Sequence, residues 1–384
     1  MSTITKIFID EITSIRQWLH QHPELSFKEF ETTKFIREKL ASWNLHLEPF
    51  HSVRTGGYVD IGKGERPMLG FRADIDALPI DENVNHVTIS LNNGIMHACG
   101  HDFHTAFGLG LAKYFADNPD DLNGRLRIFF QPAEESIPDG ASTIHKENLF
   151  NDLTGIFAVH VDLRYQTGQI AVKEGTACAS STLIKLKFNG HGGHTSRPHD
   201  TVDLVRISSL YISQITGYLK SIIDSSEDFV LVFGEIHGGH SHNIIPSQLI
   251  LQGTLRNFDN EVLEVLLKGF KQFTSDFAKI YGCQIQLEIP NSTPAIINDP
   301  HMVTGLIDFC NNSKYADRLV VMPKPSMGAD DFAYYGRVLP SLYFQIGVDG
   351  RGNSHSSDFI VQDTVLKPGL EFLISYIKHF LNKQ

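Results

Sequence analysis

The sequence has few of the features that mark nucleic-acid-binding, secreted or membrane proteins. Its 384 residues contain 33 Lys and Arg against 44 Asp and Glu, which gives a net charge of −11. Phosphate backbones recruit clustered Lys and Arg, so we expect no nucleic-acid partner. The four cysteines are widely spaced, which argues against a disulfide framework. The N-terminus has no apolar signal core, and no stretch approaches the roughly 18 apolar residues of a membrane span. These absences predict a cytoplasmic protein.

The composition is that of an ordinary globular protein. Hydrophobic residues make up 41% of the chain and charged residues 20%, so a large core can form. The length corresponds to about two domains of roughly 150 residues. Histidine is in excess, with 19 residues, several of them in clusters. This excess is the first indication of metal chemistry.

Short apolar runs alternate with helical periodicity in the first part of the chain. Residues 68–71, 125–130 and 155–160 are predicted strands, and residues 30–43 and 103–115 are predicted helices. This alternation is typical of an α/β fold with a largely parallel sheet.

The middle of the chain has a different order of elements, β-α-β-β-α-β, which is the ferredoxin-like pattern. The predicted elements are residues 183–189, 201–223, 229–237, 248–256, 259–281 and 283–289. The α/β pattern then returns, with a helix at 299–313, a strand at 341–346 and a closing helix at 363–381. We therefore predict a catalytic domain formed by residues 1–178 and 290–384, interrupted by an inserted domain at 179–289.

A dense cluster of potential metal ligands occupies residues 96–104, which read MHACGHDFH. Imidazole and thiolate are the ligands that zinc and similar divalent ions prefer. The alternative is a turn with a helix-capping Asp102 and incidental histidines. Buried histidines without partners are costly, so the pattern favours a metal site.

Two adjacent glutamates, Glu134 and Glu135, follow the predicted strand 125–130. In α/β sheets the carboxyl ends of the strands are where sites form. One carboxylate could bind a cation while its neighbour acts as a general base. Considered without their position, two solvated glutamates on a loop would explain the pair as well.

Two isolated histidines, His160 and His355, lie at or near strand ends, where a lone histidine is more often structural than a ligand. Together with Cys99, His101 and Glu135, however, they would complete a site for two metal ions that share one bridging group. The sequence contains no Gly-x-Ser-x-Gly, His-Glu-x-x-His or Gly-Lys-Ser/Thr motif, which disfavours serine hydrolases, zincins and phosphoryl transfer.

Several longer motifs resemble those of the co-catalytic metallopeptidase family of aminoacylases and carboxypeptidases. The resemblance is closest to its amidohydrolase branch of hippurate hydrolases, N-acyl-amino-acid amidohydrolases, N-acetyl-diaminopimelate deacetylases and auxin-conjugate hydrolases. It runs nearly from end to end, in the order of that branch. The motifs are RQWLHQHPELSF at 16–27, FRADIDALPI at 71–80, HACGHDFH at 97–104, QPAEE at 131–135, GGHTSRPH at 192–199, NIIP at 243–246, GTLR at 253–256 and MGADDF at 327–332.

The resemblance implies a mixed-sheet catalytic domain with two divalent metal ions, and an inserted lid domain that commonly forms a dimer or higher homo-oligomer. It implies that Cys99 bridges the metals, that His101 and Glu135 complete one site, and that His160 and His355 complete the other. Zinc or manganese is favoured, and cobalt or nickel is also acceptable. Glu134 would be the general base that activates a metal-bridging water for attack on an amide carbonyl.

The resemblance also implies supporting roles for five further residues. Asp74 and Asp102 would hold histidine tautomers and ligand geometry, although Asp102 could simply be a helix cap. His194 would be a lid histidine that stabilises the tetrahedral oxyanion, sometimes in a partner subunit. Asn243 and Arg256 would bind the free carboxylate of the substrate, with a solvated strand-end arginine as the alternative for Arg256.

The sequence departs from the usual pattern of the branch in three places: Phe103 replaces a small residue, Val161-Asp162-Leu163 follows His160, and Asp330 stands where Glu is common. They leave the metal ligands intact and bear on the acyl pocket. The expected activity is metal-dependent hydrolysis of N-acylated amino acids or related small conjugates. The alternatives are a dipeptidase or carboxypeptidase with the same two metals, and a metal-stabilised binding protein without turnover.

Overall fold

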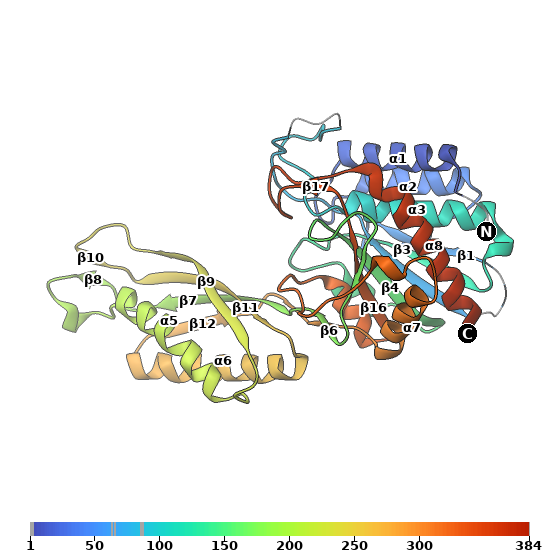
Figure 1. The fold of residues 1–384 in the computed structure, drawn as a ribbon. Coiled ribbons are helices and arrows are strands. Elements are labelled where there is room, and N and C mark those ends of the chain that lie inside the picture. The colour runs from blue at the N-terminus through green and yellow to red at the C-terminus, as the bar shows by residue number, and fades with distance from the viewer. Residues whose placement is uncertain (1–3, 63, 65–66, 85–87, 384) are drawn as a thin grey trace. The chain divides into compact units, whose positions relative to one another are not determined.

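A computed structural model describes residues 4–62, 64, 67–84 and 88–383 (Figure 1). The chain divides into two units. Unit 1 consists of Met1–Ala177, Ile297–Lys324 and Asp330–Gln384, and unit 2 consists of Cys178–Ile296 and Pro325–Ala329. The predicted insertion at 179–289 lies inside unit 2. In the described part of the chain, no helix has both the length and the apolar character that crossing a bilayer requires.

Unit 1 is built on a seven-stranded sheet with the order β1-β3-β2-β4-β16-β5-β15. Its four central strands, β3, β2, β4 and β16, run parallel. Strand β1 pairs antiparallel with β3, and β5 pairs antiparallel with β16 and parallel with β15, so the sheet is mixed. The strands are β1 Gly57–Ile61, β2 Met68–Asp74, β3 Arg125–Gln131, β4 Leu153–Asp162, β5 Ile170–Val172, β15 Leu319–Val321 and β16 Ser341–Gly347. A short pair, β17 Gly350–Arg351 and β18 Ile360–Val361, follows β16.

The two faces of this sheet are covered differently. Leu126, Ile128 and Phe130 of β3 belong to the main core cluster together with α3 and α8. On the opposite face Phe129 stacks on Phe150, with ring centroids 5.1 Å apart.

The helices of unit 1 are α1 Lys6–Gln21, α2 Phe30–Ser42, α3 His101–Asp117, α4 Ala141–Ile144, α7 Pro300–Asn311 and α8 Leu366–Lys383. Every residue of β2 is buried, as expected for a central strand between two covered faces.

Helix α3 is buried along nearly its whole length between the sheet and α8. Two glycines permit this close packing. A Cβ at Gly108 would lie 2.9 Å from the Phe130 ring, and a Cβ at Gly110 would lie 2.7 Å from Leu370. Either contact is shorter than side chains tolerate in a close-packed interior, so both positions require glycine unless the neighbours move.

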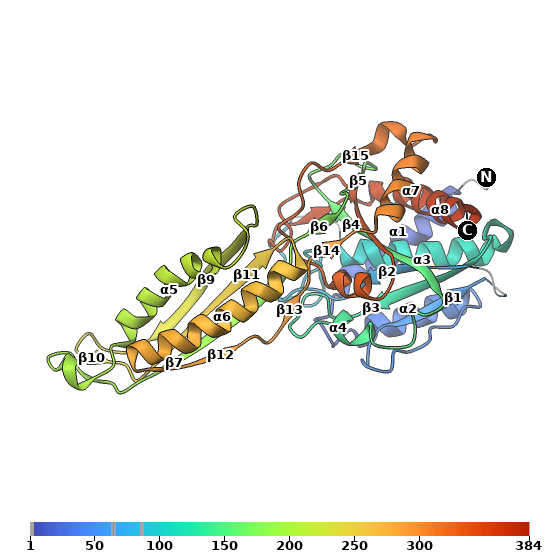
Figure 2. The same cartoon turned by 90° about the horizontal axis from the view of Figure 1, so that it is seen from below.

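Unit 2 has the predicted ferredoxin-like order of elements. Its main sheet is antiparallel, with the strand order β12-β7-β11-β9, and helices α5 and α6 cover one face of it (Figure 2). The burial of β7 alternates at every residue, because only one face of the sheet meets helices. The elements are β7 Ser181–Asn189, α5 Leu204–Ser221, β9 Phe229–Gly238, β11 Gln248–Asn257, α6 Asn260–Tyr281, β12 Gln284–Glu288 and β13 Ser292–Thr293.

A second, two-stranded sheet in unit 2 consists of β8 Gly193–His194 and β10 Ile244–Ile245. Two further short strands, β6 Thr176–Cys178 and β14 Ile296–Ile297, lie where the chain passes from one unit into the other. The short 3-10 helices are η1 Pro119–Asp121, η2 Pro198–Asp200, η3 Ala316–Arg318, η4 Asp331–Arg337 and η5 Asp363–Val365. The predicted helices and strands are therefore all present, with ends displaced by a few residues.

Candidate metal centre

The parallel strands of unit 1 bring the candidate ligands to one edge of the sheet. Asp74 at the end of β2 lies beside Gln131 at the end of β3, and His160 of β4 lies beside Gln345 of β16. The loop after β3 carries the two adjacent glutamates, and the segment after β16 carries His355. Since the carboxyl ends of parallel strands meet at the same edge, residues distant in sequence converge here.

Gly100 shapes the segment that contains Cys99 and His101. Its φ is +87°, and a Cβ added there would lie 2.3 Å from Val161. Only glycine fits this left-handed and crowded position. Helix α3 begins immediately afterwards, at His101, two residues earlier than predicted. His101, Asp102 and His104 therefore lie in its first turn rather than before the helix.

The five predicted metal ligands all lie in unit 1 and form two groups that share Cys99. One group contains Cys99, His101 and His160, with the Cys99 Sγ atom 3.4 Å from the His160 Nε2 atom. The other contains Cys99, Glu135 and His355, with the Glu135 Oε1 atom 3.1 Å from the His355 Nε2 atom. The structure brings these five residues together. It also places His101 near Glu135, with Nε2 3.8 Å from Oε1, so the predicted division of the ligands between two ions stays a prediction.

Hydrogen bonds leave one ring nitrogen of His101 and one of His160 available to bind a metal ion. The Nδ1 atom of His101 lies 3.0 Å from the backbone oxygen of Asp76 and 3.2 Å from its carboxylate. The Nδ1 atom of His160 donates to the Val161 carbonyl at 2.7 Å. His104 differs, because Asp74 and the Val161 amide occupy both of its nitrogens, at 2.6 and 3.0 Å. The Nε2 atoms of His101 and His160 are thus available to a metal ion, whereas hydrogen bonds engage both ring nitrogens of His104.

The electrostatics of the centre favour bound cations. Burial, and then the charges of Glu135 and Glu134, raise the pKa of the Cys99 thiol well above its usual value. Burial and Glu135 likewise raise the pKa of Glu134. Burial, and then His104, lower the pKa of His160 to about 4, so its ring is a neutral donor. The Glu135 Oε1 atom is buried without a well-formed hydrogen bond among the described residues. The centre combines thiol, imidazole and carboxylate groups and lacks enough positive charge to balance its acids. Such a set of ligands fits divalent metal ions.

Asp76 was missed in the sequence, although it is the second aspartate of the ADID motif. Besides holding His101, its carboxylate accepts the amide hydrogen of Glu135 at 2.9 Å and the hydroxyl hydrogen of Ser26 at 2.6 Å. It therefore connects one residue from each ligand group. Metal-ligating histidines commonly donate their second nitrogen to such a carboxylate, and the alternating acidic pattern of the motif could have revealed it.

A buried arginine, Arg72, was also missed. Its guanidinium lies 2.5 Å from Asp74, 3.0 Å from Asp330 and 2.6 Å from Asp331. Glu134 has a carboxylate oxygen close to those of Asp330 and Asp331. Arg72 therefore supplies positive charge to a group of acids that would otherwise repel one another.

The two aspartates expected to support the site have separate partners. Asp74 contacts His104 and Arg72, as described above. Asp102 accepts from His20 Nδ1 at 2.8 Å and from the amide of Phe103 at 3.1 Å. Phe103 itself is buried in the core beneath the Arg16 guanidinium, whose carbon lies 4.9 Å from the ring centroid.

His194, Asn243 and Arg256 belong to unit 2. His194 in β8 pairs with Ile244, and the Thr195 amide donates to the Asn243 carbonyl at 3.1 Å, so His194 and Asn243 lie near each other. Arg256 lies near the opposite end of β11, eight residues beyond Gln248, or roughly 26 Å along an extended strand. Its guanidinium donates to the Met327 carbonyl at 3.1 Å. Within unit 2 the structure does not bring Arg256 to the other two.

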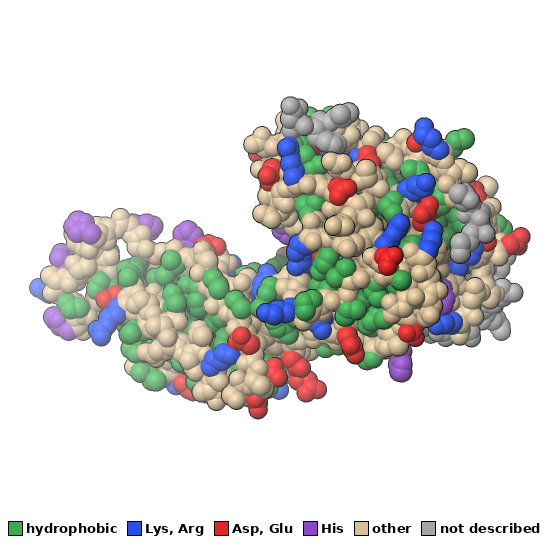
Figure 3. All heavy atoms as spheres, in the orientation of Figure 1, with side chains coloured by type: hydrophobic (Ala, Val, Ile, Leu, Met, Phe, Trp, Pro, Cys, Tyr) green, Lys and Arg blue, Asp and Glu red, His purple; other side chains and the backbone are tan. Residues whose placement is uncertain are grey.

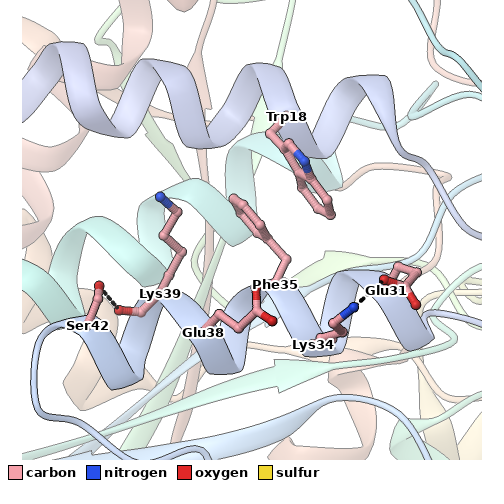
Figure 4. A pocket seen from close by; sticks show the side chains of 7 residues that line it. All are labelled: Trp18, Glu31, Lys34, Phe35, Glu38, Lys39 and Ser42. Atoms are coloured by element: carbon pink, nitrogen blue, oxygen red, sulfur yellow. Dashed lines mark hydrogen bonds and ion pairs between the residues drawn. The ribbon is translucent and has the colours of Figure 1, made fainter.

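Two surface pockets lie outside the ligand groups. One, of about 440 Å³, lies between α1 and α2, where Trp18 stacks on Phe35 with centroids 3.7 Å apart and Lys39 and Glu38 line the rim (Figure 4). The other, of about 650 Å³, is lined by His191, His237 and His240. It lies at the end of unit 2 that carries β8 and β10, where histidine side chains gather (Figure 3). Neither pocket is lined by a candidate metal ligand.

Comparison with known proteins gives a consistent set of matches. Residues 70–379 match the model of peptidase family M20/M25/M40. The chain is 33% identical over 384 residues to the N-acetyl-L-cysteine deacetylase of Bacillus subtilis, covering 100% of this chain and 90% of that protein. It is 32% identical over 369 residues to thermostable carboxypeptidase 1 of Saccharolobus solfataricus, covering 94% and 93% of the two chains.

Among solved structures, the fold is similar to a dinuclear metal binding peptidase of the M20 family from Bacillus subtilis. The TM-score is 0.83 at 29% sequence identity, and the alignment covers 99% of each chain. The likeness therefore extends over both units.

Proposed function

The chain belongs to peptidase family M20/M25/M40 and is a hydrolase that acts on amides, and from this premise we propose that it hydrolyses N-acylated amino acids with two divalent metal ions. The observation that carries the proposal is the pair of ligand groups that share Cys99, with Glu134 beside them. In the proposal, Cys99, His101 and His160 hold one ion, and Cys99, Glu135 and His355 hold the other. Zinc or manganese is favoured, and cobalt or nickel suits the same donors.

When bound, the ions supply polarisation of the amide carbonyl and lower the pKa of water. The protein supplies the proton transfers. Glu134 Oε2 lies 3.9 Å from His101 Nε2, within the ligand cluster. Its raised pKa suits a carboxylate that takes a proton from the attacking water and delivers it to the leaving nitrogen. Glu134 is therefore proposed as the general base and then the general acid.

Unit 2 is proposed to act as the lid. His194 is exposed, and its Nδ1 atom accepts the amide hydrogen of Ser196 at 3.1 Å, so Nε2 carries the hydrogen that can be donated toward a developing oxyanion. Asn243 and Arg256 are proposed to bind the substrate carboxylate, which suits an amide donor and a guanidinium fork. Because the two lie at opposite ends of the unit 2 sheet, one protomer cannot bring both to the same carboxylate within unit 2.

A second copy of the chain is the proposed partner. Strand β9 is an edge of the unit 2 sheet, and among the described residues it pairs only with β11. Val232 and Ile236 on this strand are 57% and 53% exposed. Long exposed edge strands are normally covered or paired, so β9 is a natural dimer contact. Sedimentation equilibrium should give a dimer at micromolar concentration, and a monomer throughout would contradict this contact. The predicted cytoplasmic location stays a prediction.

The substrate class rests on the similarity to an N-acetyl-L-cysteine deacetylase. A second candidate, carboxypeptidase or dipeptidase activity, is favoured by the similarity to a thermostable carboxypeptidase. A panel of N-acetyl and N-benzoyl amino acids, assayed beside dipeptides and blocked peptides in zinc or manganese, separates the two. Faster turnover of the acyl amino acids supports the proposal, and turnover confined to peptides favours the second candidate.

The adjacent glutamates provide a matched pair of variants for the mechanism. Glu134→Gln should lower kcat by roughly 10²–10⁴-fold and keep two metal ions per chain, because it removes the base without removing a ligand. Glu135→Gln should lose metal as well as activity. Metal analysis by mass spectrometry and steady-state kinetics measure both. Wild-type turnover by Glu134→Gln would refute its role as the base.

A further inference from the structure

A buried carboxylate outside the ligand set, Glu29, holds the loop that carries both glutamates of the centre. Glu29 precedes α2 and is 0% exposed. Burial and the neighbouring charge of Asp76 raise its pKa to about 7. Burying a carboxyl group costs free energy unless its oxygens accept hydrogen bonds. The hydrogen-bond partners of Glu29 therefore indicate its structural role.

Each oxygen of Glu29 has a defined partner. Oε1 accepts from the amide of Phe27 at 3.0 Å and from the amide of Ala133 at 2.9 Å. Oε2 accepts from the buried hydroxyl of Thr55 at 2.7 Å. The carboxylate thus ties together three segments that are far apart in the sequence.

Both amides belong to residues in the left-handed region of backbone conformation. The φ of Phe27 is 63° and that of Ala133 is 59°, and neither residue is glycine. Such conformations cost free energy and persist only where the surroundings enforce them. One carboxylate oxygen accepts both amide hydrogens, and it thereby anchors the peptide group on the N-terminal side of each left-handed residue.

The conformation of Ala133 bears directly on the centre, because Glu134 and Glu135 follow it. The two glutamates lie close to the same atom, the His101 Nε2 atom, with Oε2 of Glu134 at 3.9 Å and Oε1 of Glu135 at 3.8 Å. The Ala133 carbonyl also accepts from the amide of Gly140 at 2.8 Å, which closes the loop. A rotation at Ala133 would turn the following side chains away from His101.

We propose that Glu29 is a positioning residue that holds Ala133 in its left-handed conformation and thereby directs Glu134 and Glu135 toward the metal centre. The inference rests on the proposed function for the role of Glu134. It also makes a claim about metal binding, through Glu135, that is independent of any substrate.

The main test compares Glu29→Ala with Glu29→Gln in the full-length protein. Misplacement of the base should lower the kcat of Glu29→Ala by about a hundredfold with KM changed much less. Glu29→Gln should stay within about threefold of the wild type, because its amide oxygen can accept the same two amide hydrogens. Wild-type kcat in Glu29→Ala, or an equal loss in both variants, would overturn the proposal.

A second substitution tests whether Ala133 is the link. Glycine adopts positive φ without steric cost, so Glu29→Ala combined with Ala133→Gly should recover a large part of the lost kcat. A variant that merely loosens the fold would not be rescued in this way. A double variant as slow as Glu29→Ala would overturn the link through Ala133.

The matched control is Glu24→Ala on the same segment. Glu24 accepts from the amides of Glu31 and Thr32 at the start of α2, and in the described part of the chain its carboxylate accepts no hydrogen bond from the loop. It should lower the melting temperature and leave kcat unchanged. A loss of kcat equal to that of Glu29→Ala would mean that α2 itself, rather than Ala133, matters, and would overturn the proposal.

Zinc titration separates this inference from the proposed function. With Glu135 turned away, the zinc affinity of metal-free Glu29→Ala should fall about tenfold, and that of Glu29→Gln should not. Isothermal titration calorimetry with zinc alone measures this. If the wild type binds two zinc ions but hydrolyses no panel substrate, the proposed function fails while this test still applies. Unchanged zinc affinity in Glu29→Ala would overturn the inference.

Discussion

The histidines in the first turn of α3 and the exposed histidines of unit 2 are in opposite environments. In unit 1, His101 and His104 are each 1% exposed, and hydrogen bonds define the orientation of both rings. In unit 2, His194, His199 and His237 are exposed, and their contacts are to near neighbours in sequence such as Ser196 and Glu235. The same residue type is thus buried and held by hydrogen bonds at the start of α3, and exposed at these positions of unit 2.

The difference shows how burial prepares a metal centre. Burial opposes protonation of His101, but Asp74 and Asp76 outweigh it and raise its pKa to about 10. Burial, and then His104, lower the pKa of His160 to about 4. The pKa values of the His101 and His160 rings therefore differ because their surroundings differ. An exposed ring such as that of His194 is not enclosed by buried charged groups, and it is suited to contacts that form only when substrate binds.

The largest effect is expected from His101→Ala. It should reduce zinc from two ions to one per chain and lower kcat by at least about a thousandfold, because several kcal/mol of charge stabilisation depends on the lost ion. His199→Ala, at an exposed position of unit 2, is the matched control and should change neither. Metal analysis and kinetics measure both. Equal effects of the two variants would remove the distinction between the units.

An intermediate effect is expected from His194→Ala. It should lower kcat by roughly 10²–10³-fold, as loss of an oxyanion donor does. Zinc content and melting temperature should be unchanged, because the ring is exposed and packs against no core. Calorimetry and metal analysis beside the kinetics would show this separation. A drop in zinc content would place His194 among the ligands and contradict the proposed role.

The smallest effect concerns stability and pH. Burial opposes protonation of His20, but hydrogen bonds to Asp102 and Glu82 raise its pKa to about 9. The folded state then holds a proton that the unfolded state releases near pH 6.5. The stabilisation is complete below that pH and is lost as the pH rises through 9. Between pH 7 and 8 the free energy of unfolding should fall by at most about 1.4 kcal/mol.

Denaturant melts of wild type and His20→Gln at several pH values test this expectation. The variant should lack this component of the pH dependence and be nearly parallel to the wild type above pH 9. A wild-type slope retained in the variant would assign the effect to other groups.

Local patterns in the sequence predicted much of the fold and of the candidate site. Cys99 and His101, and likewise Glu134 and Glu135, are neighbours in sequence, so their spacing could be recognised directly. The alternating and helical periodicities located the elements of both units, because burial on one face imposes those periods. The start of α3 at His101 was missed because the left-handed Gly100 before it ends the preceding turn, and no side-chain cap marks that position.

Contacts between distant segments could not be predicted in the same way. The distribution of His101, Glu135, His160 and His355 between two groups depends on how four strand ends converge. Arg72 and Glu29 acquire their roles from partners more than 100 residues away, Asp331 and Ala133. No local period or spacing encodes such a pairing, because it arises from the order of strands in the sheet.

Helix α3 has a consequence for how such an enzyme can diversify. Its first turn carries His101, and its glycines at 108 and 110 leave no space for larger side chains against Phe130 and Leu370. Most substitutions along it would therefore disturb the core and the centre together. We expect an altered substrate preference to arise by mutation in exposed loops of unit 2, while α3 stays nearly invariant among functional descendants. A library randomised at those loops should accordingly retain far more active clones than one randomised along α3.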